Sequence, residues 1–366
     1  MITRASLKAR EAQDKRLSND LAALTAKAKG AYAALVALVL GGGYGRGEGS
    51  WYRDDKGRWH PYNDYDVFVI ADRALGKTNR RKLEVDLAQQ LGITVDLIEY
   101  SKPQLQELKL SIKSLDLKYA SQVFYGDERI LDEIPDFEAN KIPLKEVETL
   151  YFTRLQTFGG GLSSGAWRRG VSGEQSRFFR NQMAKAVLAG VDAILVESGE
   201  YDPSYRTRVE RLSGFKHLKS QEIERAKWAL AEKLNPRDDP LDPEKLVCLY
   251  RDSYGFFEKN MFRVLGRFYG GNIESAADLV RLKQNGWRGI IRRLYWFVRD
   301  RNLEIERANI VFHVQALLVD YLGKRWRDDH LLQEGVRLLQ KLDPRVPDDC
   351  SPEGALELAA EIRLKQ

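Results

Sequence analysis

Cysteine, histidine and long apolar runs are scarce in this chain of 366 residues. Its two cysteines, Cys248 and Cys350, form no C-x-x-C pair, which argues against a disulfide framework and against a thiolate zinc site. His60 has no second histidine nearby, so a histidine metal site is not expected either. No stretch reaches the roughly eighteen apolar residues of a membrane span, and the amino terminus lacks a cleavage-site pattern. We therefore expect a cytoplasmic protein without a membrane partner.

The overall composition is that of a folded globular protein. Hydrophobic residues make up 43% and charged residues 31% of the chain, and its length allows two domains that each bury a core. The formal net charge of +6 fits an anionic ligand, but it does not separate a nucleotide from a nucleic acid.

Three aspartates on two apolar segments are the most informative feature of the sequence. Asp64 and Asp66 open the segment 63–70 (NDYDVFVI), and side chains two positions apart on a strand project to the same side. Mutual repulsion of two such carboxylates favours a site that binds a divalent cation. Asp96 lies in the middle of a second apolar segment, 93–98 (ITVDLI), and three carboxylates can hold two metal ions.

A glycine-dense turn precedes these acids. Residues 41–49 (GGGYGRGEG) contain six glycines in nine positions. Glycine admits positive φ and lets backbone N–H groups approach phosphate oxygens closely. An ordinary glycine-rich β-turn is the alternative interpretation, and the acids downstream favour a phosphate-binding turn.

Hydrophobic periodicity predicts an α/β part followed by a helical part. A helix over 5–29, a core strand over 31–40 and a helix over 77–90 combine with the acid-bearing strands into a β-turn-β-α-β core. Beyond Pro143 the strand signals fade. Helical patterns follow at roughly 144–158, 174–198, 219–234, 243–269, 276–300 and 303–323.

In order and residue type, the segments between about 30 and 130 resemble the DNA polymerase β-type nucleotidyltransferase superfamily. Its pattern is a hydrophobic strand, Gly-[Gly/Ser], a short turn that often carries Arg-Gly, then Asp-x-Asp and a later single Asp. The matching residues here are Gly42-Gly43, Arg46-Gly47, Asp64-x-Asp66 and Asp96. The resemblance implies an α+β fold, with a small mixed-sheet nucleotidyltransferase domain over 1–140 and an all-α helical domain over 141–366, as in bacterial members of the superfamily.

The resemblance also implies roles for the matched residues. Asp64, Asp66 and Asp96 would ligate a catalytic Mg²⁺, and the first two would also hold the Mg²⁺ that arrives with the NTP. Gly42 and Gly43 would bind phosphate through main-chain donors, since the serine frequent at the second position is absent. Arg46 would add positive charge beside the triphosphate, and a salt bridge between Arg46 and Glu48 is an equally open interpretation. For the acids, the alternative is a solvated strand end and a paired core carboxylate.

Lys185 is the candidate nucleotide-binding residue of the helical part. It shares one stripe of an apolar helix with Asn181 and Asp192, because offsets of four and seven residues keep side chains aligned. Related nucleotidyltransferases often place a lysine of the helical domain against the triphosphate. A structural pair between Lys185 and Asp192 is the alternative.

Three other segments have two interpretations each. The aromatic-rich segment 50–62 is expected to be a loop with a possible hairpin at 55–57, either a surface loop fixed by its aromatic residues or a loop whose aromatics stack on a base or shape the acceptor pocket. The segment 159–170 is either a cationic lid or an exposed linker. The cluster of Arg292, Arg293, Arg299 and Arg301 indicates an amphipathic bundle helix first and an RNA contact second.

The sequence thus suggests a magnesium-dependent enzyme that uses two Mg²⁺ ions. It would transfer a nucleoside monophosphate from an NTP, with ATP the first choice, to a hydroxyl of a small molecule or protein and release pyrophosphate. Terminal nucleotide addition to RNA is an alternative that the lack of a recognisable RNA-binding motif does not favour. A non-catalytic nucleotide sensor is a further alternative, against which the presence of all three acids argues.

Overall fold

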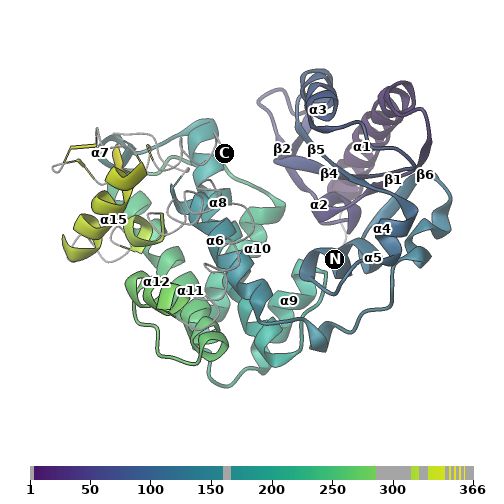
Figure 1. The fold of residues 1–366 in the computed structure, drawn as a ribbon. Helices are drawn as coiled ribbons and strands as arrows, with labels where there is room; N and C mark the ends of the chain where they lie inside the picture. Colours follow the sequence, from purple (N-terminus) through teal and green to yellow (C-terminus); the bar gives the residue numbers. More distant parts are fainter. Residues whose placement is uncertain are drawn as a thin grey trace. The chain divides into compact units, whose positions relative to one another are not determined.

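The computed structural model describes residues 4–159, 166–285, 315–320, 329–342, 346–347, 350–351, 354–355 and 358 (Figure 1). The chain divides into two compact units. Unit 1 comprises Met1–Pro143, Gly199–Glu210 and Lys233–Pro236, and unit 2 comprises Leu144–Ser198, Arg211–Glu232 and Arg237–Gln366. Two short segments that were predicted to belong to the helical domain, Gly199–Glu210 and Lys233–Pro236, therefore belong to unit 1 with the sheet.

Unit 1 is built on a four-stranded mixed sheet. Its main elements are α1 (Arg4–Ala31), β1 (Leu35–Leu40), β4 (Asp64–Ala71), α3 (Lys77–Leu91), β5 (Thr94–Tyr100) and β6 (Gln122–Gly126). The strand order is β5-β4-β1-β6, with β4 and β5 parallel and β1 antiparallel to both of its neighbours. The predicted β-turn-β-α-β core is confirmed, and the fold class is α+β.

The first strand starts later than expected. Residues up to Ala31 continue α1, and the amide of Tyr32 still donates to the carbonyl of Ala28 at 2.8 Å. Ala33 and Ala34 form a turn that separates the end of the helix from the strand. The strand begins at Leu35.

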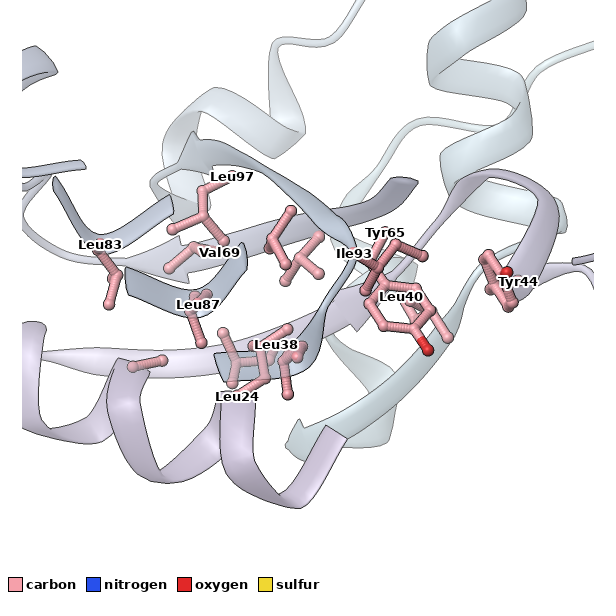
Figure 2. Packing of buried hydrophobic residues seen from close by; sticks show 14 of the residues in the cluster. Leu24, Leu38, Leu40, Tyr44, Tyr65, Val69, Leu83, Leu87, Ile93 and Leu97 are labelled. Carbon is pink, nitrogen blue, oxygen red and sulfur yellow. The ribbon is translucent and has the colours of Figure 1, made fainter. Parts of the chain in front are cut away.

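Strand alternation gives the sheet two apolar faces. On the first face, α1 and α3 cover side chains that include Leu38, Leu40, Tyr65, Val69 and Leu97, with Leu24, Leu83 and Leu87 supplied by the helices (Figure 2). The second face carries Ala37, Val39, Phe68 and Ile70 against α4 (Lys102–Gln106), α5 (Ile112–Tyr119) and the 3₁₀ helix η1 (Glu128–Glu133). Because side chains alternate with period two, Asp64, Asp66 and Asp96 belong to this second face.

The segment 50–62 is a two-stranded hairpin, as the possible hairpin at 55–57 suggested, rather than an irregular loop; a contact of its aromatics with a base or an acceptor stays a prediction. Strands β2 (Ser50–Arg53) and β3 (Trp59–Tyr62) pair antiparallel. The amide of Gly57, whose φ is +78°, donates to the carbonyl of Asp54 at 2.8 Å and closes the turn. Aromatic side chains opposite one another stabilise such a pair, and the rings of Tyr52 and His60 stack with centroids 5.3 Å apart.

In its described residues, unit 2 is helical apart from one isolated bridge between Val171 and Leu241. Its helices are α6 (Lys145–Gly159), α7 (Ala166–Arg169), α8 (Gly173–Ser198), most of α10 (Ser220–Leu234), α11 (Pro243–Tyr269), α12 (Ala276–Asn285) and α15 (Asp329–Leu342). The shorter elements of the chain are α2 (Gly42–Gly45), α9 (Tyr205–Arg211), and the 3₁₀ helices η2 (Ala139–Lys141) and η3 (Leu212–Gly214). Aromatic packing joins α6 to α11, where the rings of Tyr151 and Phe257 stack at 5.5 Å.

Some predictions fall outside the described residues. These are the glycine-rich part of the lid or linker at 160–165, and the parts of the helical patterns over 286–314 and 321–323 with Arg292, Arg293, Arg299 and Arg301; residues 315–320 of the last pattern are described and helical. Both cysteines are free thiols. Among the residues that the structure describes, none of the helices combines the length and the apolar character needed to cross a bilayer.

Candidate functional site

The register of β4 and β5 brings the three predicted acids together. In this parallel pair, the Cα of Asp66 lies opposite that of Asp96, and Asp64 lies opposite Thr94. Carboxylate oxygens of Asp64, Asp66 and Asp96 lie within 4.8 Å of one another. Acids 30 residues apart in the sequence therefore form one cluster at the edge where β4 and β5 begin.

The backbone around the cluster is fixed by the start of β4. The amide of Gly41, one residue beyond β1, donates to the carbonyl of Asp66 at 2.8 Å and extends the pairing of β1 with β4. Asn63, directly before the strand, has a φ of +77°, and asparagine tolerates this left-handed conformation better than most residues. Its side-chain amide donates to the hydroxyl of Ser50 at 3.3 Å, which fixes the chain as it enters the site.

The electrostatics of the cluster favour a bound cation. Burial and, to a lesser degree, the negative charges of Asp64 and Asp96 raise the pKa of Asp66 to about 6. The charges of Lys233 and Arg46 lower this pKa but do not cancel the effect. Oxygen ligands from three carboxylates are the donor set that Mg²⁺ prefers, so these residues fit a divalent metal ion.

The glycine turn packs directly against the acids. Gly42 has a φ of +57°, and a Cβ atom placed on it would lie 2.0 Å from Oδ2 of Asp66. A Cβ on Gly45 would lie 2.2 Å from the carbonyl oxygen of Leu40. Glycine is therefore required here by close approach within the protein itself, in addition to any approach of a ligand.

Several amides of the turn are used within it. Gly45 donates to the carbonyl of Gly41 at 2.8 Å, and Glu48 donates to that of Gly43 at 2.7 Å. The first amides of α2, those of Gly42 and Gly43, are the ones that a helix start leaves without an acceptor in its own helix. These are the two glycines that the sequence pattern predicts to bind phosphate.

Arg46 lies at the end of the turn and is held by acids. Its Nη1 lies 2.9 Å from Oδ2 of Asp116, its Nε lies 3.7 Å from Oε2 of Glu48, and only 8% of its side chain is exposed. The ion pair with Glu48 considered from the sequence is present, and Asp116 is an additional partner that the sequence did not indicate. A contact of Arg46 with polyphosphate stays a prediction.

Two lysines next to the cluster were missed by the sequence pattern. Lys233 is 7% exposed, its Nζ donates to the hydroxyl of Ser50 at 3.1 Å, and its charge acts on Asp66. Burial lowers the pKa of Lys113 on α5, the charge of Asp66 partly offsets this, and the Lys113 Nζ lies 5.7 Å from the ring centroid of Phe68. A lysine in the last turn of an amphipathic pattern normally indicates a solvated position, so the sequence offered no signal for Lys233.

Lys185, the predicted nucleotide-binding lysine, lies half-buried on α8 in unit 2. The same helix carries Asn181 and Asp192, both buried, so the predicted stripe lies in the core of that unit. A role of Lys185 in binding nucleotide stays a prediction.

Comparison with known proteins gives little similarity. No protein-family model and no curated protein matches the sequence. A spectinomycin adenyltransferase from Enterococcus faecialis, crystallised with ATP and spectinomycin, is one solved structure with some likeness. It has 12% sequence identity and a TM-score of 0.38, and the match covers 66% of this chain and 98% of that chain. A likeness at this level does not identify a function for this chain.

The close approach of Gly42 to Asp66 predicts a position-specific cost of alanine. Gly42→Ala should destabilise the protein by about 2–4 kcal/mol, because the new methyl group overlaps a carboxylate and the backbone has positive φ. Gly47→Ala is the matched control, since Gly47 also has positive φ (+72°) but has no atom within 4 Å of its Cβ position. It should cost only about 1 kcal/mol. Urea unfolding of both variants measures the difference, and equal costs would contradict the packing described.

The raised pKa of Asp66 predicts how its charge affects stability. A carboxylate whose pKa is higher in the folded than in the unfolded state destabilises the fold once it ionises, so this cost develops between about pH 4 and pH 7. Without divalent cation, Asp66→Asn should therefore be more stable than the wild type at pH 7.5, by about 1–3 kcal/mol, and equally stable near pH 4. Chemical unfolding in EDTA at both values measures this.

Saturating Mg²⁺ should reverse the order at pH 7.5, because the cation stabilises only a protein that binds it. A wild type that Mg²⁺ does not stabilise would contradict the assignment of a cation site to these acids.

Proposed function

We propose that this protein is a magnesium-dependent nucleotidyltransferase. It transfers a nucleoside monophosphate from an NTP, ATP in the first instance, to a hydroxyl of a small-molecule or protein acceptor and releases pyrophosphate. The observation that carries the proposal is the convergence of Asp64, Asp66 and Asp96 within 4.8 Å, with Gly42 packed against one of them. The sequence pattern that suggested this chemistry required those elements to meet.

The three acids are proposed to hold two Mg²⁺ ions. When bound, the ions would supply charge neutralisation at the α-phosphate and the departing pyrophosphate and lower the pKa of the acceptor hydroxyl. Asp64 and Asp66 bind on the nucleotide side in this proposal, and Asp96 binds on the acceptor side. Their common strand register keeps the carboxylates in place before the substrates arrive, which reduces the reorganisation needed during transfer.

The phosphates are proposed to lie against the start of α2 and Lys233. The amides of Gly42 and Gly43 supply neutral donors, and Lys233 supplies a positive charge that already acts on Asp66. Keeping an ammonium group buried is costly unless negative charge lies close to it, and a polyphosphate would supply more. Lys233 is thus a structural candidate for the role that the sequence pattern gave to Lys185.

The other hypotheses receive less support. The arginines that suggested an RNA acceptor lie outside the described residues, and no motif adds to them. A sensor without turnover would not require all three acids in one cluster, since two carboxylates suffice for a nucleotide-bound magnesium ion.

Removal of one acid should abolish transfer. Asp64→Ala should lower the transfer rate by at least about 10³-fold. Each carboxylate helps to hold an ion, and the ion stabilises the negative charge of the transition state by several kcal/mol. The assay incubates purified protein with ATP, GTP, CTP and UTP labelled at the α-phosphate, Mg²⁺ and a cell extract, and follows the fraction that acquires label. Asp86→Ala, which removes an exposed acid from α3, is the control and should keep full activity. An Asp64→Ala protein with most of its activity would rule out the site.

Substitution of Lys233 and of Lys185 should affect nucleotide binding differently. If Lys233 contacts phosphate, Lys233→Met should weaken binding of the α,β-methylene analogue of ATP by roughly 10- to 100-fold, as expected for loss of a charge-assisted hydrogen bond. On the same hypothesis, Lys185→Met should leave the dissociation constant of the analogue within about threefold of the wild-type value. A larger loss would indicate that Lys185 contacts the triphosphate. Isothermal titration calorimetry with Mg²⁺ measures both, and unchanged binding by Lys233→Met would exclude Lys233 from the role.

A further inference from the structure

We infer that Arg46 and Asp116 are positioning residues that fix the glycine turn beside the acids, and that Arg46 does not bind the polyphosphate directly. The inference rests on the proposed function, because it assigns a role within the same site. It replaces the direct contact that the sequence pattern gave to Arg46.

The guanidinium group of Arg46 is already surrounded by protein partners. It lies 2.9 Å from a carboxylate oxygen of Asp116 and 3.7 Å from one of Glu48. Its central carbon also lies 4.5 Å from the ring centroid of Tyr205, a distance typical of a cation–π contact. An almost fully buried side chain is therefore hydrogen-bonded to Asp116 through Nη1, while Glu48 and the ring of Tyr205 lie close to it without a hydrogen bond.

Asp116 connects Arg46 to a second arginine. The Oδ2 atom of Asp116 lies 3.8 Å from Nη2 of Arg208, and its Oδ1 accepts a hydrogen bond of 3.1 Å from the hydroxyl of Tyr201. Arg208 is 2% exposed and donates to the carbonyl of Pro203 at 2.6 Å. Its central carbon lies 4.5 Å from the ring centroid of Tyr201.

Glu48, the other charged residue of the turn, is hydrogen-bonded to the same segment 199–210 that carries Tyr201 and Arg208. Its carboxylate, 5% exposed, accepts hydrogen bonds from the amides of Tyr205 at 2.7 Å and Arg206 at 3.1 Å, and from the hydroxyl of Ser204 at 2.9 Å. These donors form the start of α9, so a residue of the glycine turn caps a helix more than 150 positions away in the sequence.

Arg46, Arg208 and Glu48 are buried, and Asp116 keeps 20% of its side chain exposed. Glu48 also lies 3.9 Å from Nε of the more exposed Arg206. Arg46 and Arg208 contribute two positive charges, and Asp116 and Glu48 contribute two negative ones. Loss of one member would leave an uncompensated buried charge, which is far more costly than loss of a surface ion pair. The position of the turn thus depends on Asp116, and Gly42 transmits that position to Asp66 because the two are packed without space between them.

Neutralising Asp116 should change analogue binding in opposite directions, depending on whether Arg46 positions the turn or contacts the phosphates directly. A direct phosphate contact by Arg46 should become stronger, or stay unchanged, when its competing carboxylate is removed. A positioning role predicts that Asp116→Asn loosens the turn and weakens binding of Mg²⁺ with the α,β-methylene analogue of ATP by about tenfold or more, measured by calorimetry.

Arg46→Lys provides the second arm. A lysine keeps the charge but cannot engage two carboxylates and a ring in the same planar geometry, so binding should fall as much as in Asp116→Asn. With Arg46→Gln also measured alone, the double variant Arg46→Gln with Asp116→Asn should lose less than the product of the two single effects, because it removes one positive and one negative charge together. Unchanged or tighter binding by Asp116→Asn, together with near-normal binding by Arg46→Lys, would overturn the inference.

Tyr201→Phe covers the case in which Asp116→Asn does not fold. It removes one hydrogen bond to Asp116 without changing any charge, and it should weaken analogue binding by about threefold. Thermal unfolding and circular dichroism verify that each variant is folded. Unchanged analogue binding by folded Tyr201→Phe, with Arg46→Lys also near normal, would count against positioning.

Mn²⁺ binding in the absence of nucleotide separates this inference from the proposed function. Measured by electron paramagnetic resonance, it should weaken by about threefold or more in Arg46→Lys, which preserves charge and changes only geometry. A wild type that binds Mn²⁺ but transfers no label would contradict the proposed function alone. Equal Mn²⁺ and analogue binding by wild type and Arg46→Lys would contradict the positioning role alone.

Discussion

The parallel register of β4 and β5 is the constraint on which the site depends. It sets Asp66 opposite Asp96, with Asp64 two residues away on the same face of the sheet. Three like charges at this spacing oppose folding, and together with burial, the larger cause, they raise the pKa of Asp66. A slip of β5 by one residue would turn Asp96 to the opposite face, and the same slip of β4 would turn Asp64 and Asp66. The apolar residues that alternate with the acids on both strands pack under α1 and α3 and prevent that slip. Packing on the first face of the sheet therefore fixes the positions of the acids on the second face.

A second constraint comes from the glycine turn. The turn can approach Asp66 because Gly42 has no side chain, and it is fixed there by charged residues whose partners lie on α5 and in the segment 199–210. Long-range ion pairs that are buried and mutually balanced are sensitive to the loss of any member, which gives the turn one defined position. Pre-organisation of this kind is useful where a polyphosphate and metal ions must be bound in a fixed relation.

Much of this arrangement could be predicted from the sequence, because it depends on local patterns. Apolar periodicity predicted the strands, alternation placed Asp64 and Asp66 on one face, the family resemblance added Asp96 to their site, and the glycines of 41–49 predicted the turn. Contacts between distant segments could not be predicted. Nothing near Asp116 or Glu48 indicates a partner at Tyr201 or Tyr205, and Lys233 follows a helical pattern whose polar positions normally face water. The hairpin at 50–62 was underestimated because pairing of aromatic residues across strands depends on register, which a single segment does not reveal.

The central claim is that the three acids form one cation site, and crystals soaked in Mn²⁺ test it most directly. Anomalous scattering locates the ion independently of any assumption about activity. We predict an anomalous peak within bonding distance of oxygens from Asp64, Asp66 and Asp96, and a second peak when the α,β-methylene analogue of ATP is added. Carboxylates too far apart to share an ion, or Mn²⁺ peaks only elsewhere on the protein, would contradict the account.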